Sequence, residues 1–261
     1  MQYLLPPKPQ YYLAQITDCH LLTSAEAVYN GCQPAQHLKQ IVNTLAANQP
    51  DAVILTGDLT QDHSAASYQL LAQLLSPLKC PVFVTPGNHD DPQQLQQLMT
   101  QQVLRPERSI VLGHWQLLLV NSKGPTPAGT FALHEQHWLM QQLAASQAPA
   151  FWLYCHHHPA ALNCFIDKHG QQDAQRLWQT LQSDPRIRGI AHGHAHMAYH
   201  RQQGAIDIVG CPASSVQFLA TPDWQTRNEG PQWCDWFFSA DANNSRSDTA
   251  GNTVCWQFQQ L

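Results

Sequence analysis

Charged residues are scarce in this chain of 261 residues, because Asp, Glu, Lys and Arg together make up only 12% of it. Only 13 residues are Lys or Arg, the formal net charge is −5, and the sequence pI is near 6.3. Proteins that bind duplex nucleic acid use Lys and Arg to replace condensed counterions, so this composition argues against a nucleic-acid partner. Hydrophobic residues reach 43%, which is typical of a folded globular enzyme and too high for a disordered chain.

Long apolar runs and an export signal are also missing from the sequence. No segment approaches the ~18 consecutive apolar residues of a membrane helix. The first ten residues contain one lysine and three prolines, and they lack the charged start and long apolar body of a signal peptide. We therefore expect no membrane partner and a cytoplasmic location.

The eight cysteines show neither a CxxC pair nor a dense framework of short spacings. In a chain of this length the pattern predicts reduced and mostly buried thiols, as in a cytosolic protein. A disulfide between Cys234 and Cys255, on two late strands, is the alternative.

Short apolar runs alternate with longer helical patterns, which predicts an α/β fold formed by one domain over residues 1–261. The strands expected in the sheet core are Tyr11–Thr17, Ala52–Thr56, Val82–Thr85, Trp115–Val120, Phe151–Cys155, Ile187–Ala191 and Ala205–Val209. The expected helices are Pro34–Ala47, Ala65–Leu75, Pro92–Thr100, Glu135–Ala145 and Gln172–Leu181.

After Met197 the expected strands, including Trp233–Phe238 and Thr253–Phe258, follow one another without helices. This change from alternating strands and helices to strands alone favours two sheets that face each other with helices outside. Strands from about residue 205 are then expected to complete the second sheet. Asp241–Gly251 is rich in Asn, Ser and Asp and predicts a hairpin connection.

Three expected strands end in potential metal ligands, namely Asp18-Cys19-His20, Gly57-Asp58 and Gly87-Asn88-His89-Asp90. If the backbone stays extended at the first motif, Asp18 and His20 project to one side and Cys19 packs on the other. Each motif alone also fits a helix cap or a turn. Oxygen and imidazole ligands without paired thiolates are typical of a catalytic site for manganese, iron or zinc.

Two histidine clusters complete this pattern. His156, His157 and His158 follow one apolar strand, and His192, His194 and His196 surround a glycine after the next. A lone histidine is usually a core or surface residue, but two clusters at two strand ends favour a metal centre. The ligands are spread over most of the chain, so they are expected to meet only in the fold.

The order D-x-H, GD, GNHD, a histidine cluster and GHxH resembles the calcineurin-like metallophosphoesterases. Within that family the chain is similar, over roughly residues 11 to 220, to the bacterial CpdA-type 3′,5′-cyclic-AMP phosphodiesterases, a type of class III cyclic nucleotide phosphodiesterase. The segments that carry the closer similarity are residues 16–20, residues 56–62, Leu133 with Gln136 and Trp138-Leu139, His156-His157-His158-Pro159 and Val216-Gln217-Phe218. The resemblance implies a four-layer αββα sandwich and two divalent metal ions, with Fe²⁺ or Mn²⁺ favoured and Zn²⁺ or Co²⁺ as alternatives.

The resemblance also implies roles for individual residues. One metal would be held by Asp18, His20 and His196, the other by Asn88, His156 and His194, and both by Asp58. His89 would be the catalytic proton donor, and the substrate would contact Asn88, His89, His196 and His157. The sequence departs from the subgroup at Ala195, and at residues 29–33, a loop that could reach the site and alter substrate preference.

The implied reaction is hydrolysis of 3′,5′-cyclic AMP to 5′-AMP, with a hydroxide that bridges the two metals as nucleophile. Asp90 and Asp62 are expected to orient histidine rings. Another phosphodiester, a nucleotide or a lipid diphosphate is an alternative substrate, and a non-catalytic metal-binding scaffold is an alternative function. The expected partner is a small cyclic nucleotide, and the expected assembly is a monomer or a homodimer.

Overall fold

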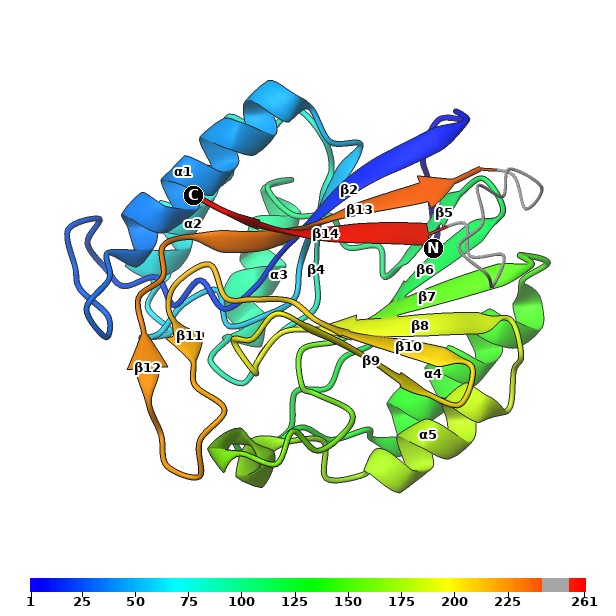
Figure 1. Ribbon diagram of the computed structural model, residues 1–261. Helices are drawn as coiled ribbons and strands as arrows, with labels where there is room; N and C mark the ends of the chain where they lie inside the picture. The colour runs from blue at the N-terminus through cyan, green and yellow to red at the C-terminus, as the bar shows by residue number, and fades with distance from the viewer. Residues whose placement is uncertain (241–253) are drawn as a thin grey trace.

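Two β-sheets face each other in the computed structural model, which describes residues 1–240 and 254–261 (Figure 1). The five-stranded sheet has the order β14 (Val254–Gln260), β13 (Gln232–Ser239), β2 (Gln10–Ile16), β3 (Ala52–Leu55), β4 (Val82–Val84). The seven-stranded sheet has the order β1 (Tyr3–Leu4), β5 (Ser109–Leu112), β6 (Trp115–Leu119), β7 (Ala150–Tyr154), β8 (Ile187–His192), β10 (Ile206–Gly210), β9 (Tyr199–Gln203). A hairpin of β11 (Gln217–Phe218) and β12 (Thr226–Arg227) stands apart. The predicted Asp241–Gly251 loop lies outside the described residues.

Helices cover the outer face of each sheet (Figure 1). The five-stranded sheet packs against α1 (Pro34–Asn48), α2 (Ala65–Leu75) and α3 (Pro92–Thr100), and the seven-stranded sheet packs against α4 (Leu133–Ala145) and α5 (Ala174–Gln182). These layers confirm the predicted αββα sandwich. Within the described residues, none of these helices has both the length and the apolar content needed to span a bilayer.

The alternation of side chains along a strand explains how each sheet supports two cores. On β7, Trp152 and Tyr154 belong to the core between the sheets, whereas Phe151 and Leu153 pack toward α4 and α5. A strand buried on both faces is apolar throughout, and this is the pattern that made β7 recognisable in the sequence. Residues of both sheets share the central core, which supports the prediction of one domain.

The C-terminal strands divide between the two sheets, so the prediction that they complete the second sheet is wrong for β13 and β14. β10 pairs with β8 in the seven-stranded sheet, but β13 pairs antiparallel with β2 in the other sheet. The physical reason is that β2 has a second edge whose backbone groups need partners, and β13 satisfies them. Trp236 and Phe238 then extend the core between the sheets.

Several elements were not predicted: β1, β5, β9, β11, β12 and a 3₁₀ helix, η1 (Phe165–His169). β9 is mostly exposed and polar, so it has no apolar run that would signal a strand. All eight cysteines lie within the described residues and have free thiols. Cys234 lies opposite Phe258, and Cys255 opposite Phe237, so the pairing of β13 with β14 separates the two cysteines of the alternative disulfide.

Candidate metal centre

The candidate ligands lie in the loops that follow β2, β3, β4, β7 and β8. Five of them have left-handed backbone, with φ between 48° and 61°: Asp18, His20, Asp58, His194 and His196. Such a conformation costs free energy for a residue with a side chain and persists where the surroundings impose it. The expectation of extended backbone at the first motif is therefore wrong, although Cys19 is fully buried in the core as predicted.

Two glycines allow these loops to approach one another closely. A Cβ atom on Gly57, whose φ is +91°, would lie 2.5 Å from the backbone nitrogen of Gly87. A Cβ on Gly193 would lie 1.9 Å from Oγ1 of Thr17. No side chain fits at either position, so the glycines bring loops of both sheets to one point.

The first cluster consists of Asp18, His20 and His196. Nε2 of His196 lies 3.2 Å from Nε2 of His20 and 3.2 Å from Oδ1 of Asp18. The other ring nitrogens face acceptor oxygens, because Nδ1 of His20 is 2.7 Å from Oε1 of Gln61 and Nδ1 of His196 is 2.6 Å from the carbonyl of Val216. Each Nδ1 therefore donates, and each Nε2 presents a lone pair to the cluster.

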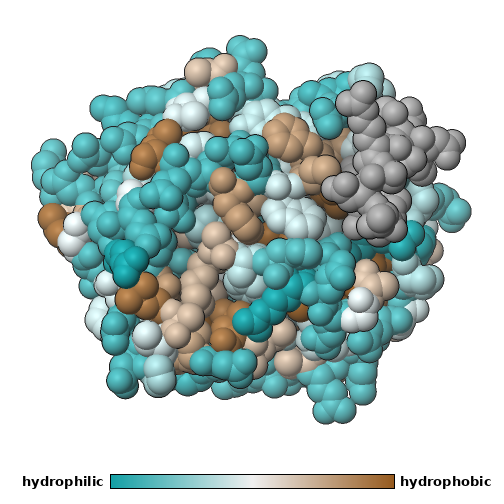
Figure 2. Space-filling view, in the orientation of Figure 1, coloured by the Kyte–Doolittle hydropathy of each residue, from teal (hydrophilic) through white to brown (hydrophobic). Residues whose placement is uncertain are grey.

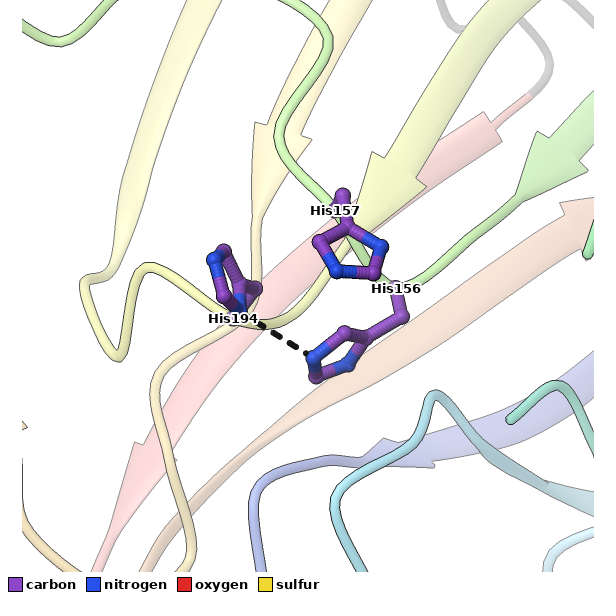
Figure 3. Close-up of side chains that lie close together, drawn as sticks. All are labelled: His156, His157 and His194. Carbon is purple, nitrogen blue, oxygen red and sulfur yellow. Dashed lines mark hydrogen bonds between the residues drawn. The ribbon is translucent and has the colours of Figure 1, made fainter. Parts of the chain in front are cut away.

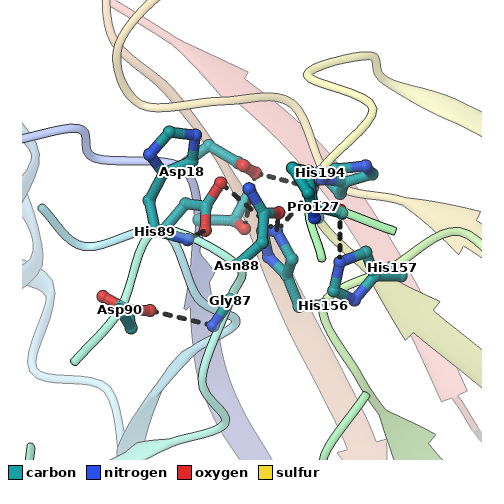
Figure 4. Close-up of polar contacts among 12 residues, drawn as sticks. Asp18, Gly87, Asn88, His89, Asp90, Pro127, His156, His157 and His194 are labelled. Carbon is teal, nitrogen blue, oxygen red and sulfur yellow. Dashed lines mark hydrogen bonds and ion pairs between the residues drawn. The ribbon is translucent and has the colours of Figure 1, made fainter. Parts of the chain in front are cut away.

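The second cluster consists of Asn88, His156 and His194 (Figure 4), and Figure 3 shows its two histidines. Nε2 of His156 lies 3.2 Å from Oδ1 of Asn88 and 3.2 Å from Nδ1 of His194. Nδ1 of His156 is 2.7 Å from the carbonyl of Thr56, which fixes the ring in the orientation with Nε2 toward the cluster. His156 thus presents Nε2 as the histidines of the first cluster do, whereas His194 presents Nδ1, and its Nε2 has no hydrogen-bond partner among the described residues.

Asp58 lies between the two clusters. Its Oδ2 is 3.4 Å from Nε2 of His156 and 3.9 Å from Nε2 of His20. Its Oδ1 accepts a hydrogen bond of 2.7 Å from the backbone N–H of His89. One oxygen of Asp58 therefore faces both clusters, while the other is held by the chain.

These atoms form a site for cations. Oδ2 of Asp18 accepts hydrogen bonds from Thr17 Oγ1 and from the backbone of His194, but its Oδ1 has no hydrogen-bond partner among the described residues. A buried carboxylate oxygen without a partner is costly, and lone pairs that converge on one point repel each other. A divalent cation would resolve both problems, so the residues present fit the metals expected from the sequence.

The electrostatics of the histidines differ between the clusters. Burial lowers the pKa of His20 to about 4, so this ring is neutral at pH 7. Burial also acts on His156, but the carboxylates of Asp58 and Asp18 outweigh it and raise the pKa of His156 to about 9. Burial opposes the charge of Asp58, yet His156 and His20 hold the pKa of this carboxyl well below its usual range.

His89 lies beside the two ligand clusters but belongs to neither of them. Its ring packs edge-on against the ring of His20, at 5.3 Å between centroids, and stacks on His63 at 5.9 Å. Nδ1 of His89 has no hydrogen-bond partner in the described part of the chain, and the residue lines the cavity above the clusters. This position suits a group that exchanges a proton with a ligand in the cavity.

The prediction that His157 contacts substrate does not fit its position. The side chain is fully buried, its Nδ1 is 2.8 Å from Oγ of Ser122, and its Nε2 is 3.2 Å from the carbonyl of Pro127 (Figure 4). Both ring nitrogens are therefore engaged by the chain, and His157 is not among the residues that line the cavity. His158 is also buried, and its Nε2 lies 3.3 Å from Oδ1 of Asp167 in η1.

Asp90 and Asp62 do not orient histidines, contrary to expectation. Asp90 accepts hydrogen bonds from the backbone N–H groups of Leu59 and Gly87 and from the hydroxyl of Tyr68. Asp62 accepts hydrogen bonds from the backbone N–H groups of Thr23 and Ser64. The histidines instead face backbone carbonyls and Gln61, which carry no signal in the sequence because every residue has a carbonyl.

A cavity of about 260 Å³ opens over the clusters. Its floor includes Asp58, Asn88, His194 and His196, together with His20 and His89. The loop of residues 29–33 reaches it as anticipated, because Tyr29 lines the cavity and stacks on His20 at 4.8 Å. Phe218, in a segment that carries the subgroup similarity but had no predicted role, also lines the cavity, and its ring stacks face to face on His196 at 3.9 Å.

The family described as calcineurin-like phosphoesterase matches residues 11–198. A "probable cyclic nucleotide phosphodiesterase" of Pseudoalteromonas sp. (strain SM9913) is 40% identical, over 85% of this chain and 85% of the relative. The "3′,5′-cyclic adenosine monophosphate phosphodiesterase CpdA" of Vibrio vulnificus (strain CMCP6) is 33% identical, over 85% of this chain and 83% of the relative. These findings confirm the resemblance that the motifs predicted.

Solved structures agree on the fold. A dimetal phosphatase from Danio rerio superposes with a TM-score of 0.60 at 12% identity, over 87% of this chain and 96% of its own. The purple acid phosphatase from seeds of yellow lupin (Lupinus luteus) gives a TM-score of 0.62 at 14% identity, over 97% of this chain and 54% of its own.

Proposed function

This chain belongs to the calcineurin-like phosphoesterase family, and on that premise we propose that it hydrolyses 3′,5′-cyclic AMP to 5′-AMP at a dinuclear metal centre. The observation that carries the proposal is the pair of buried ligand clusters that share Oδ2 of Asp58. The names of the relatives from Pseudoalteromonas and Vibrio supply the substrate class. A non-catalytic scaffold would need neither the second cluster nor His89.

Each cluster would hold one divalent cation. Asp18, His20 and His196 would bind the first, and Asn88, His156 and His194 the second. Asp58, whose Oδ2 faces both clusters while its Oδ1 accepts a hydrogen bond from the backbone of His89, would contribute to both sites. Fe²⁺ or Mn²⁺ suits this mixed nitrogen and oxygen ligand set, as do Zn²⁺ and Co²⁺.

Two cations bound here would supply positive charge for the phosphoryl oxygens and would lower the pKa of a bound water, which would provide a hydroxide nucleophile near neutral pH. In the proposed reaction the hydroxide oxygen would bond to phosphorus while the bond from phosphorus to the 3′-oxygen breaks, which would open the ring. His89 then donates a proton to the 3′-oxygen, which leaves 5′-AMP.

The chain's own side chains would position the phosphate. The amide of Asn88 directs Oδ1 at His156, and its N–H groups would donate to a phosphoryl oxygen. His89 and His196 line the same cavity and would contact the substrate beside Asn88. His157 would act only by supporting the loop that carries His156.

We further propose a small cyclic nucleotide as the partner, a monomer or homodimer as the assembly, and the cytoplasm as the location. The scattered free cysteines support a reducing compartment, and the acidic balance of charge supports the absence of a nucleic-acid partner.

A turnover screen tests the function directly. The protein, reconstituted separately with Fe²⁺, Mn²⁺, Zn²⁺ and Co²⁺, is offered 3′,5′-cyclic AMP, cyclic GMP, 2′,3′-cyclic AMP, bis(p-nitrophenyl) phosphate and UDP-linked lipids. We expect the highest kcat/KM on 3′,5′-cyclic AMP, with 5′-AMP as the product. Preference for another diester, or 3′-AMP as the product, would contradict the proposal.

A further inference from the structure

Three of the aromatic side chains that line the cavity come from η1 and from the region of β11 and β12. They are Phe165 of η1, Phe218 of β11 and Trp224 of the segment between β11 and β12, and Lys168 and His169 of η1 line the cavity beside them. We call Phe165, Phe218 and Trp224 the aromatic rim. Figure 2 shows hydrophobic residues among hydrophilic ones on the lower left of this face, where β11 and β12 lie in Figure 1.

The rings of the rim have different surroundings. Phe218 has one face on His196, and its ring meets that of Phe165 in an edge-to-face contact at 5.1 Å. Phe165 is half-buried, whereas Trp224 is 55% exposed, one of the few large apolar side chains on the surface. An exposed indole costs free energy in water and indicates a surface that binds an apolar or flat group.

The two segments of the rim are tied to each other and to the core of the site. The backbone N–H of Phe165 donates to the carbonyl of Thr221 at 3.0 Å, which joins η1 to the segment that carries Trp224. Asp167 anchors η1 from behind, because its Oδ1 lies 3.3 Å from Nε2 of His158. The rim is therefore held in place before any ligand binds.

Ala195 is the residue of the GHAH motif at which this chain departs from the subgroup, and its small size explains how η1 comes close to the ligand clusters. Its side chain is fully buried and packs with Leu162, Cys164 and Ile166, residues within or directly before η1. The small side chain between two candidate ligands leaves room for this cluster. A bulkier residue there would push η1 away from the cavity.

We propose that Phe165 and Trp224 bind the nucleobase of the substrate by stacking, an inference that rests on the proposed function. In a 3′,5′-cyclic nucleotide the phosphate is fused to the ribose, and the base projects from the opposite side of the sugar. With the phosphate at the ligand clusters, the base would lie farther from them, and Phe165 and Trp224 line the same cavity. Aromatic side chains bind nucleobases through their π-faces.

The test compares two substrates that share the cyclic phosphate. One is 3′,5′-cyclic AMP, and the other is methyl riboside 3′,5′-cyclic phosphate, in which a methoxy group replaces the base. Phe165→Ala and Trp224→Ala should each lower kcat/KM on cyclic AMP roughly ten-fold, mainly through KM, and change it less than about two-fold on the riboside. Trp224→Phe, which keeps an aromatic face, should recover most of the loss.

Met140→Ala is the matched control, since Met140 is 50% exposed on α4 and does not line the cavity. It should leave both substrates unaffected. Equal losses on the two substrates in the rim variants would overturn the stacking, because they would indicate a general disturbance of the metal site.

A binding measurement separates this inference from the proposed function. Titration with 5′-AMP should quench tryptophan fluorescence in the wild type, ribose 5-phosphate should not, and the quenching should be lost in Trp224→Phe. If the wild type hydrolyses no cyclic nucleotide, the proposed function fails while this titration still decides the stacking. Quenching that survives in Trp224→Phe, or is equal with ribose 5-phosphate, would overturn it.

Discussion

The Nε2 atoms of His20 and His196 lie 3.2 Å apart, and the Nδ1 atom of each ring faces an acceptor oxygen. With both Nδ1 atoms donating, the two Nε2 lone pairs point at each other in a buried space. Only a cation or an additional proton makes this arrangement favourable. Burial lowers the pKa of His20 to about 4, so a proton does not serve this purpose on His20 at neutral pH.

The ligand clusters predict two bound ions per chain, with separable ligand sets. His20→Ala should leave one ion, and His156→Ala should leave one ion at the other position. Asp58→Ala should weaken both, because Oδ2 of Asp58 faces both clusters. Anomalous scattering from metal-soaked crystals and elemental analysis of each variant provide the count. A single ion in the wild type, or one held by other residues, would refute the assignment.

Binding of metal should release a proton from His156. The pKa of this ring is raised to about 9, so in the metal-free protein it is protonated at pH 7, whereas a metal ligand needs the free lone pair. The apparent affinity for Mn²⁺ should therefore rise up to about ten-fold per pH unit as the pH increases toward 9, and then level off.

The same raised pKa affects the stability of the metal-free protein with a definite sign. Because the folded pKa of His156 lies above the unfolded value of 6.5, its contribution is fully present below pH 6.5 and is lost as the pH rises through 9. For metal binding, calorimetric titration of the protein with Mn²⁺ in buffers of different ionisation enthalpy measures how many protons His156 and the other ligands release. Release of none at pH 7 would contradict the prediction.

His89→Ala should retain both metals and near-normal substrate affinity, while kcat on cyclic AMP falls by roughly 10²-fold or more. The loss should be smaller on a p-nitrophenyl ester, because this leaving group departs without a proton. Equal losses on both substrates would assign His89 to phosphate binding. A variant that has lost a metal would make His89 a ligand.

Thiol titration should find all eight cysteines reactive in denatured, unreduced protein. Seven of them are buried or half-buried and one, Cys255, is exposed, so only Cys255 should react rapidly in the native state. The register of β13 and β14 keeps Cys234 and Cys255 from facing each other. Loss of two thiols in protein from a reducing cytosol would disprove the pattern.

Gln15 should matter for stability rather than chemistry. Its buried amide donates to Oγ1 of Thr56 and accepts from Nε1 of Trp236, so it links β2 to β13 and to the residue that directly follows β3. Gln15→Ala leaves these partners unsatisfied and should lower the free energy of unfolding by about 1–3 kcal/mol. Urea unfolding measures the change, with the exposed Gln257→Ala as control. An equal, small effect of both substitutions would refute this role.

The sequence predicted the strands that are buried on both faces, because such strands are continuous apolar runs, as β7 shows. It also placed the candidate ligands correctly at strand ends, since parallel strands present their carboxyl ends at one edge of a sheet. The sequence could not indicate which strand pairs with the free edge of another strand. β9 is polar and exposed, and the choice of β2 as the neighbour of β13 depends on backbone groups that every residue carries.

At the site the sequence determined which residue types gather, through motifs whose glycines and histidines stand at fixed spacings. Tertiary structure decided what each side chain faces. His157 and His158 follow His156 directly, yet hydrogen bonds to Ser122 and Pro127 turn His157 away, and Asp167 engages His158. Phe218 meets His196 only because β11 folds back over the GHAH loop. Contacts between distant segments leave no local pattern, so only the folded chain reveals them.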